Sequence, residues 1–184
     1  MKSIKHFLIL SLLPSLLFFI SCGKDDNEAE PAEYVTMMMD NALIDMNSLG
    51  GSARADKTQI NIGIGFLNTL SVNISLGNGY RLEIYIPGYD GPSTYLTATE
   101  LNYTPIGGQS NRFTLTREDD QETWESGQSI IDIPNVTPGE FIVHKEENGY
   151  IKGVFFFDAY DGSEVSKKVV TDGKFKIELD KNEF

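Results

Sequence analysis

An alternation of apolar and polar residues with a period of two constrains the fold of this chain more than any other feature. Apolar side chains stand at every second position over 60–66, 70–76 and 80–86. Successive side chains of a strand point to opposite faces, so each run predicts a strand with one buried face. The connections at 67–69 and 77–79 contain Asn or Gly, which tolerate the positive φ of tight turns. We therefore predict a three-stranded antiparallel meander over 58–86.

The same reasoning predicts strands in the rest of the chain. Upstream, strands over 34–39 and 42–46 flank Asp40-Asn41, a pair typical of tight turns. Downstream, strands are expected over 95–97, 112–116, 130–133, 140–145, 150–159, 167–171 and 175–179, with a turn at Asp172-Gly173. No connection is long enough for the crossover helix of a parallel sheet. About ten strands without a helix predict an all-β fold, as a single antiparallel sandwich or a partly closed barrel.

The strands near the C-terminal end predict which side chains form the core. Phe155 and Phe157, like Phe175 and Ile177, are separated by two, and the charged neighbours Lys174, Lys176 and Asp158 belong in water. The four apolar side chains should therefore face inward. The strand at 150–160 is unusual because Phe156 makes its second face partly apolar as well. Either another segment covers this second face, or it is open to a partner or an apolar ligand.

The N-terminal residues have the pattern of a targeting signal and not of a folded domain. A basic start precedes an apolar run over 7–20, which ends in Ile20-Ser21-Cys22. This pattern indicates an export signal, and a cysteine at the cleavage point resembles a lipobox, where the thiol is joined to diacylglycerol. The run is shorter than the ~20 residues that span a bilayer. We expect residues 1–21 to be a lipoprotein signal peptide and Cys22 to be the lipid attachment site; a plain secretory signal and an uncleaved anchor are the alternatives.

The segment after the cysteine predicts a tether and a destination. Residues 22–33 are acidic, with no apolar side chain larger than proline beyond the cysteine, so we expect a flexible tether before one domain over 34–184. Lys24, Asp25 and Asp26 resemble the export signal that Bacteroidota lipoproteins carry after the cysteine. That resemblance implies display on the outer face of the outer membrane, and a generic acidic spacer facing the periplasm is the alternative.

Several segments together resemble a family. The turn at Asp40-Asn41 and the strands at 139–143, 149–157 and 171–177 resemble small Bacteroidota lipoproteins whose shared domain has no assigned function. The family usually has Gly after the first Asp and an aromatic residue shortly after it, where this chain has Asn41 and Ile44. The resemblance implies a β fold and supplies no catalytic residues.

The sequence offers little catalytic chemistry. After removal of the signal, one histidine, His144, and no free cysteine remain, which is too few for a His/Cys zinc site or a Cys-His nucleophile pair. His144 could complete a serine triad, but a lone histidine on a strand is more often structural. Asp158, Asp161 and Glu164 could offer oxygens to calcium, but their spacing matches no EF-hand loop and fits a turn better. We predict no metal and no cofactor.

Binding is the simpler hypothesis, because three aromatic residues stand in polar surroundings. Tyr85 lies on the polar face of its strand, Tyr89 in a Gly/Pro loop and Trp124 in an acidic segment, so these rings should meet solvent and could stack on sugars or partner proteins. Trp124 could instead fold back over the end of a sheet. The formal charge of −12 disfavours nucleic acid and anionic lipid head groups as partners.

Three functions follow from these observations. The first is a surface-exposed outer-membrane lipoprotein that acts as a non-enzymatic binding or accessory module for a glycan or a protein. A groove lined by Tyr85, Tyr89 and Trp124, with Phe156 as a further candidate contact, would favour it. The alternative is a lipocalin-like barrel with an apolar ligand in an internal cavity. The weakest is a hydrolase, which requires His144 near a serine and a carboxylate.

Overall fold

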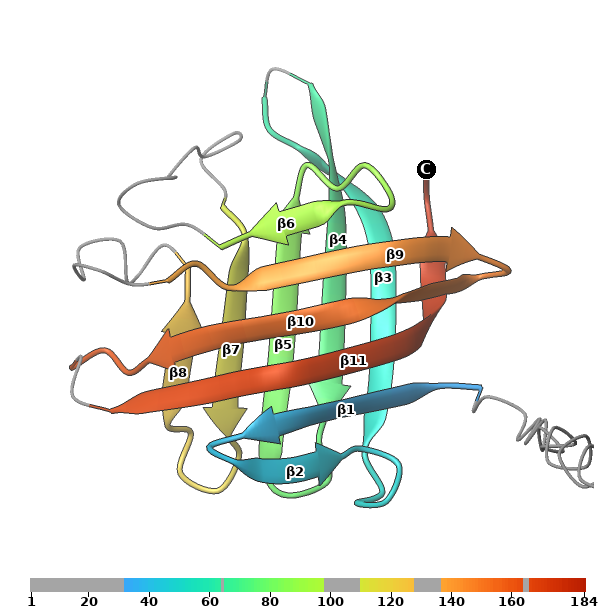
Figure 1. Cartoon of the computed structure of the whole chain (residues 1–184). Coiled ribbons are helices and arrows are strands. Elements are labelled where there is room, and N and C mark those ends of the chain that lie inside the picture. Colours follow the sequence, from blue (N-terminus) through green and yellow to red (C-terminus); the bar gives the residue numbers. More distant parts are fainter. Residues whose placement is uncertain (1–31, 64, 98–109, 128–136, 164–165) are drawn as a thin grey trace, which may run out of the picture. The chain divides into compact units, whose positions relative to one another are not determined.

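The chain folds as an all-β domain, as predicted (Figure 1). The computed structural model describes residues 32–63, 65–97, 110–127, 137–163 and 166–184. These residues form eleven strands and no helix. The strands are β1 (Tyr34–Met39), β2 (Ala42–Asp45), β3 (Ser52–Asn61), β4 (Phe66–Ser75), β5 (Tyr80–Pro87), β6 (Thr94–Leu96), β7 (Arg112–Arg117), β8 (Thr123–Ser126), β9 (Glu140–Glu147), β10 (Tyr150–Tyr160) and β11 (Lys167–Asn182). The strand expected over 130–133 lies outside the described residues.

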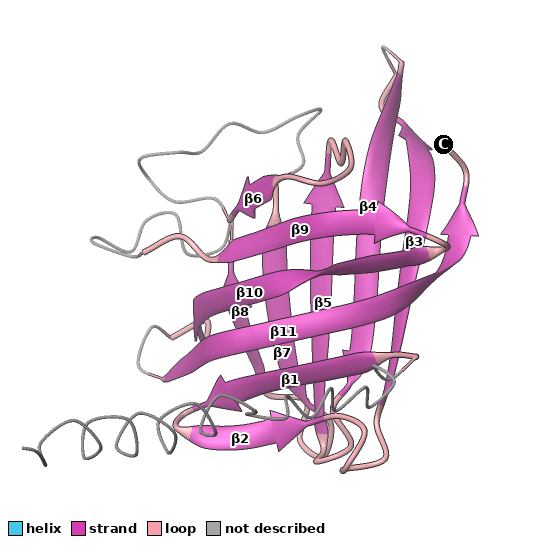
Figure 2. Ribbon diagram, turned by 45° about the vertical axis from the view of Figure 1, so that its right-hand side comes forward, coloured by secondary structure: helices cyan, strands magenta, loops and turns pink. Residues whose placement is uncertain are grey.

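The strands form two layers that cross each other (Figures 1 and 2). One layer contains β2, β1, β11, β10, β9 and β6, and the other contains β3, β4, β5, β7 and β8. Hydrogen bonds connect the layers at two corners, where β11 pairs with β3 and β10 meets β8. The sheet therefore returns on itself as a ring, consistent with the predicted sandwich or partly closed barrel.

One pairing departs from the antiparallel pattern. The end of β11 runs parallel to β3, with Leu179 opposite Ala55 and Asn182 opposite Lys57. Parallel strands that neighbour each other in sequence need a long crossover connection, usually a helix. Here the two partners are separated by all the strands from β4 to β10, so the connection between them is most of the domain.

The predicted meander is present as β3, β4 and β5, but its first turn lies elsewhere. The chain reverses between Asn61 and Phe66, where the N–H of Ile62 donates to the carbonyl oxygen of Gly65 at 3.0 Å. Gly63 has a φ of +83°, which allows this earlier reversal. The expected apolar face over 60–66 is therefore wrong. Ala55 and Lys57 are the buried side chains of β3, and Phe66 is exposed.

The expected turn at Asp172-Gly173 is a bulge inside β11. Phe155 pairs with Gly173 and Phe157 with Val170, so β11 has one residue more than β10 over this stretch. Asp172 has a φ of 53°. A Cβ on Gly173 would lie 2.4 Å from the carbonyl oxygen of Phe155. The close approach explains the glycine, and the two expected strands are one continuous strand.

The core lies between the two layers and is rich in aromatic rings. Phe155, Phe157, Phe175 and Ile177 are all buried, which confirms their predicted inward orientation. Ring centroids are 5.0 Å apart for Phe113 and Phe157, from opposite layers. The largest fully buried side chains are Trp124, Tyr89, Phe113, Phe141, Phe155 and Phe175. The described interior is therefore filled by side chains from both layers.

Candidate functional site

The predicted anchor residues lie outside the described part of the chain. This applies to Cys22, Lys24, Asp25 and Asp26. Within the described residues, no helix is long and apolar enough to cross a membrane. Glu33, the last residue of the predicted tether, already belongs to the domain, because its Oε1 accepts the N–H of Glu178 at 2.8 Å.

Tyr89 does not meet solvent, and the expectation that it does is wrong. Its side chain is 0% exposed, and its ring stacks on Tyr95 with centroids 5.4 Å apart. Its hydroxyl donates to Oε2 of Glu146 on β9 at 2.9 Å. Burial and the nearby Glu146 carboxylate raise the pKa of Tyr89 well above its usual value. The Gly/Pro loop therefore folds back and inserts its tyrosine into the core.

Trp124 is also buried, at 1% exposure, because the acidic segment contains the strand β8. Trp124 pairs with Leu115 of β7, and its Nε1 donates to Oγ of Ser166 at 2.9 Å. The Nζ of Lys168 lies 5.1 Å from the ring centroid. Trp124 is therefore part of the core and not an exposed platform.

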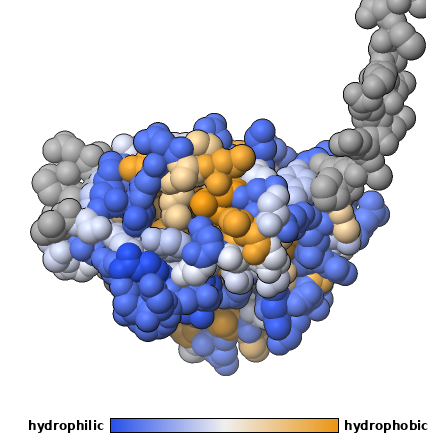
Figure 3. Space-filling model, turned by 90° about the horizontal axis from the view of Figure 1, so that it is seen from below, coloured by the Kyte–Doolittle hydropathy of each residue, from blue (hydrophilic) through white to orange (hydrophobic). Residues whose placement is uncertain are grey.

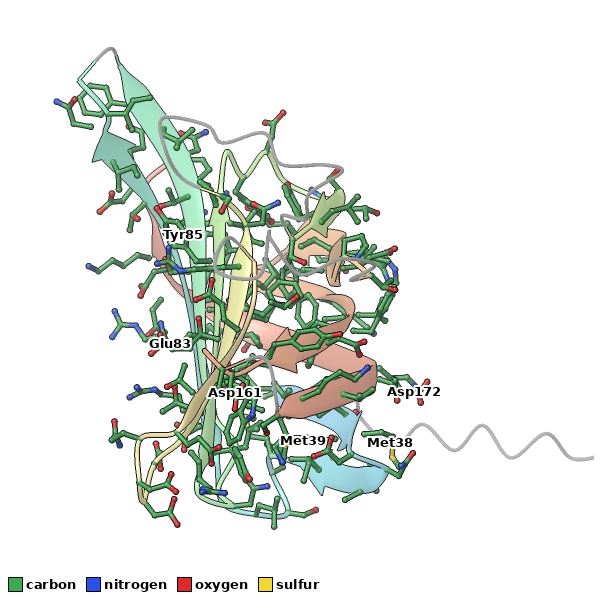
Figure 4. The ribbon with its side chains drawn as sticks, turned by 90° about the vertical axis from the view of Figure 1, so that its left-hand side faces the viewer. Met38, Met39, Glu83, Tyr85, Asp161 and Asp172 are labelled. Atoms are coloured by element: carbon green, nitrogen blue, oxygen red, sulfur yellow. The ribbon has the colours of Figure 1, made fainter. Side chains whose placement is uncertain are left out.

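Tyr85 is the predicted aromatic residue that remains at the surface. It is half-buried on the outer face of β5, between Ser71 of β4 and Arg112 of β7. Figure 4 shows Tyr85 and Glu83 on the same side of this layer, pointing away from the other layer. Together with neighbours on β4 and β7 they line a hollow of about 140 Å³, formed by Ser71, Val72, Asn73, Glu83, Ile84, Tyr85, Arg112 and Thr114. We call this hollow the Tyr85 site.

The position of each side chain in the Tyr85 site follows from strand register. Ser71, Tyr85 and Arg112 form one row across β4, β5 and β7. Asn73, Glu83 and Thr114 form the next row on the same face, because side chains two residues apart share a face. Rigid strands therefore hold a ring, an amide, a carboxylate, a guanidinium and two hydroxyls within one shallow area.

The electrostatics of the Tyr85 site keep its phenol neutral. Burial raises the pKa of Tyr85, and the positive charge of Arg112 opposes that shift in part. The guanidinium carbon of Arg112 lies 4.6 Å from the ring centroid, in a cation–π contact. The Glu83 carboxylate is 3.1 Å from Nε of Arg81 and remains half-exposed. The site thus offers hydrogen-bond donors and acceptors around one ring.

Phe156 lies in a second, more apolar hollow. Its side chain is 37% exposed, so the second face of β10 is only partly covered. The hollow measures about 200 Å³ and lies beside the bulge of β11; it is lined by Thr137, Pro138, Phe156, Phe157, Asp158, Val170 and Thr171. The Asp158 carboxylate is paired with Lys167 at 2.9 Å. This hollow presents fewer free polar groups than the Tyr85 site does.

The described residues give no support to a catalytic or metal site. His144 is exposed on β9, and in the described part of the chain no hydrogen bond joins it to a serine or a carboxylate. No group of three described His, Cys, Asp or Glu side chains could hold a metal ion. The Asp161 carboxylate accepts hydrogen bonds from the N–H and hydroxyl of Ser163, which is the predicted turn chemistry. Glu164 lies outside the described residues.

Sequence reasoning missed a buried polar cluster that joins the two layers. Lys57 of β3 is buried, and its Nζ lies 2.5 Å from Oε1 of Glu146 on β9. Tyr89 binds the other oxygen of the same carboxylate. The ring of Phe184 lies 4.6 Å from the Lys57 ammonium. The alternation Ala53, Ala55, Lys57 is the signal that could have placed the lysine inward.

Comparisons with known proteins do not assign a function to the chain. No protein-family model, no curated protein and no solved structure matches the chain. The Tyr85 site is therefore the basis for the functional argument.

Proposed function

We propose that the chain is a lipid-anchored, surface-displayed binding module that recognises a neutral glycan through the Tyr85 site. The observation that carries this proposal is one half-buried ring surrounded by an amide, a carboxylate and hydroxyls on a rigid sheet face. A sugar ring has apolar C–H faces that stack on an aromatic ring, and hydroxyls that both donate and accept hydrogen bonds. Asn73 and Glu83 supply the matching groups.

The charge of the molecule favours a neutral sugar over an anionic one. The chain has 27 Asp and Glu against 15 Lys and Arg. Its field repels polyanions. In the site itself, Glu83 offsets part of the positive charge of Arg81 and Arg112. Arg112 lies over the ring, so a bound sugar would take the place of its guanidinium or bridge to it.

The two competing functions have less support. An apolar ligand inside a barrel needs internal space, and the described interior is filled by rings such as Phe113, Phe141 and Phe175. A hydrolase built on His144 needs hydrogen bonds from this histidine to a serine and a carboxylate, and neither bond is present among the described residues. The binding module remains the function that the geometry supports best.

The location is part of the proposal and rests on sequence features. We propose that lipid on Cys22 anchors the chain to the outer membrane, that Lys24, Asp25 and Asp26 direct it to the cell exterior, and that it is related to the small Bacteroidota lipoproteins it resembles. A rigid binding face beyond an acidic tether suits capture of glycan outside the cell.

Glycan binding can be tested with a matched pair of tyrosines. We expect neutral hexose oligosaccharides to bind the mature chain on an array and in calorimetry. Tyr85→Ala should weaken this binding roughly tenfold, the effect of losing about 1.4 kcal/mol at a central aromatic contact. Tyr150→Ala is the control, because Tyr150 is also half-buried and has a cation, Lys176, 5.3 Å from its ring centroid, but on the other layer. Equal losses in both variants, or no binding by the wild type, would contradict the proposal.

The anchor can be tested in cells. Cys22→Ser removes the thiol that accepts diacylglycerol, so labelling with a radioactive fatty acid should disappear. Replacement of Lys24, Asp25 and Asp26 by alanine should leave the label in place but protect the chain from protease added to intact cells. A Cys22→Ser variant that is still labelled would contradict lipid attachment at Cys22. Unchanged protease access in the triple variant would contradict the export signal.

A further inference from the structure

The outer face of β10 and β11 lies on the opposite side of the domain from the Tyr85 site. Figure 1 shows the layer that contains β10 and β11 in front of the layer that contains β5. Figure 4 shows Asp172 of β11 pointing away from that second layer. Phe156 of β10 is 37% exposed on this face, beside the hollow of about 200 Å³ described above. We call the outward side chains of β10 and β11 the β10–β11 face.

Exposed apolar surface alone does not distinguish this face from others. Leu43 of β2 is 70% exposed. Figure 3 views the end of the domain at β2 and shows a hydrophobic patch among hydrophilic residues. The β10–β11 face differs from that patch in the order of its side chains along each strand.

The outward side chains of β10 have the same order from both ends of the strand, except that the charge is inverted. From the first residue they are a tyrosine, a cation and an apolar side chain, and then an apolar side chain, an anion and a tyrosine: Tyr150, Lys152, Val154, Phe156, Asp158 and Tyr160. The alternate residues from Ile151 to Ala159 are buried, so these six side chains share the outer face. The centre of the order lies between Val154 and Phe156.

The outward side chains of β11 show the same inversion of charge about this centre. Lys167 and Glu178 stand at the two ends of the stretch that pairs with β10. Asp172, in the bulge, and Lys174 stand next to the centre. In both pairs of positions a cation is therefore mirrored by an anion. Lys176 is the exception, because an uncharged valine takes the mirrored position.

We propose that the β10–β11 face is a homodimer interface, in which a second copy of the chain presents its own β10–β11 face. The twofold axis lies in the interface and crosses the strands between Val154 and Phe156, so each half of the face meets the other half of the second copy. Lys174 meets Asp172 of the second copy, and Asp172 meets Lys174. Val154 and Phe156 meet in the same way at the centre. One symmetry operation thus brings opposite charges together and apolar side chains together.

The dimer also extends an ion pair that exists within each copy. The Nζ of Lys167 lies 2.9 Å from Oδ2 of Asp158. Across the axis, Lys152 of the second copy meets Asp158, and Glu178 of the second copy meets Lys167. Four charges of alternating sign then form one network, and networks stabilise more than isolated surface ion pairs do. Both copies are acidic, but salt screens exposed charges more than ~8 Å apart at physiological ionic strength, so the close pairs dominate.

The size of the layer fits a dimer that dissociates on dilution. The strand β10 has 11 residues. With ~3.3 Å per residue and ~4.8 Å between strands, β9, β10, β11 and β1 together cover roughly 700 Å². A standard interface takes ~800 Å² from each partner. Sheets that pack face to face lie ~10 Å apart with their strands within ~30° of each other, and side chains fill that space. The Tyr85 sites lie on the outer faces of the dimer and stay uncovered.

Sedimentation equilibrium of the mature chain, from residue 22 onward, tests the proposal. Every sample carries Cys22→Ser, so that no disulfide can join two chains. This chain retains the fold, because Pro31–Phe184 forms a compact unit that contains the whole described core. We expect a reversible equilibrium between monomer and dimer.

Lys174→Glu should raise the dissociation constant of the dimer roughly tenfold or more, because like charges that face each other across an interface are strongly unfavourable. Adding Asp172→Asn removes that repulsion, and asparagine tolerates the φ of 53° at this position. The double variant should therefore dimerise more tightly than Lys174→Glu alone. Lys181→Glu is the control, because it makes the same change of charge at an exposed lysine beyond this face, where β11 pairs with β3.

A second pair of variants tests the apolar centre. Phe156→Ala should weaken the dimer, whereas Tyr85→Ala, which removes a ring from the opposite face of the domain, should not. Circular dichroism spectra equal to that of the wild type show that each variant is folded. The proposal is overturned if the wild type is monomeric at roughly 1 mM, where even a weak specific contact is occupied. It is also overturned if Lys174→Glu weakens the dimer no more than Lys181→Glu does, or if Phe156→Ala has no effect, because the dimer then forms through another surface.

Discussion

Phe156 and Phe157 are neighbours in β10 with opposite surroundings. Phe157 is buried between the layers against Phe113, whereas Phe156 lies at the surface hollow beside the β11 bulge. Phe157→Ala should cost ~3–5 kcal/mol of unfolding free energy, because it leaves a cavity in a core that both layers share. Phe156→Ala should cost about 1–2 kcal/mol, since over a third of its surface is already in water. Urea titrations of both variants measure the difference.

Lys176→Ala is the control for this pair, because Lys176 lies on the outer face of β11, next to buried Phe175 and Ile177. Its cost should stay within ~0.5 kcal/mol. Three equal costs would show that side-chain alternation does not describe these strands. A Phe156 cost as large as that of Phe157 would show instead that another segment covers the second face.

At the residue scale, the sequence predicted strand positions better than loop positions. The surface location of Tyr85 followed from alternation within its own strand. The location of Tyr89 depends on Tyr95 and Glu146, whose proximity to the loop results from tertiary packing. Local polarity around Trp124 indicated a loop, but pairing with Leu115 made that segment a strand. Periodicity contains no information about such distant partners.

The β1–β2 hairpin is attached to β11 through its turn residue Asp40. The Oδ1 of Asp40 accepts the N–H of Val169 at 3.0 Å, and Oδ2 lies 2.9 Å from Nζ of Lys168. Partial burial opposes ionisation of Asp40, but these two hydrogen bonds outweigh it and lower its pKa below the usual value. A carboxyl whose pKa is lowered by folding stabilises the folded state above the unfolded pKa of ~3.9. That stability is lost as the pH falls through the folded pKa.

Asp40→Asn tests this dependence without changing the turn, because asparagine also tolerates the φ of 51° at this position. The variant should be less stable than the wild type at pH 7 by at most ~1 kcal/mol, since both partners are partly exposed. The difference should shrink as the pH falls below 4 and the wild-type carboxyl becomes protonated. Urea titrations at pH 3 and pH 7 measure it. A difference that is the same at both pH values would show that Asp40 acts only through the turn.

At the element scale, hairpins were easier to predict than registers. The β1–β2 hairpin and the strands β9 and β10 were predicted close to their observed bounds, since Asn and Gly mark their turns. The β3–β4 turn was misplaced by a few residues because Gly63 reverses the chain within an apolar run. A misplaced turn reverses which side chains face inward, which is why Lys57 was not expected in the core.

The pair of Lys57 and Glu146 connects the two layers across the domain. Its side chains are mostly buried, at 7% and 20% exposure. Glu146→Ala leaves the Lys57 ammonium buried without its partner and should cost ~3–5 kcal/mol. The double variant Lys57→Met with Glu146→Ala should cost less than Glu146→Ala alone, because no unpaired charge remains, and the single variant Lys57→Met completes the cycle. Urea titration of all three variants measures the coupling. Strictly additive costs would show that the two groups do not act as a pair.

At the scale of the whole molecule, the sequence predicted the class of fold but not how the two layers join. Alternation and turn residues are local, and they sufficed for an all-β domain with one core. The parallel pairing of β11 with β3 joins residues more than a hundred positions apart, and neither strand carries a local sign of it. The Tyr85 site required the register of three strands, so sequence alone identified only its tyrosine.

The shared strand β11 also sets the order in which the domain can fold. It follows every other strand in the chain, yet it pairs with β1 and β10 in one layer and with β3 in the other. The layer that contains β1 and β10, and the corner with β3, are incomplete until β11 has been synthesised, and the β11–β1 and β11–β3 contacts have large sequence separations, which slow folding. During synthesis the hairpins can form early, but the two layers cannot close at the corner of β3 and β11 until the end of the chain is available. Closure of the two layers at this corner therefore waits for the last strand of the chain.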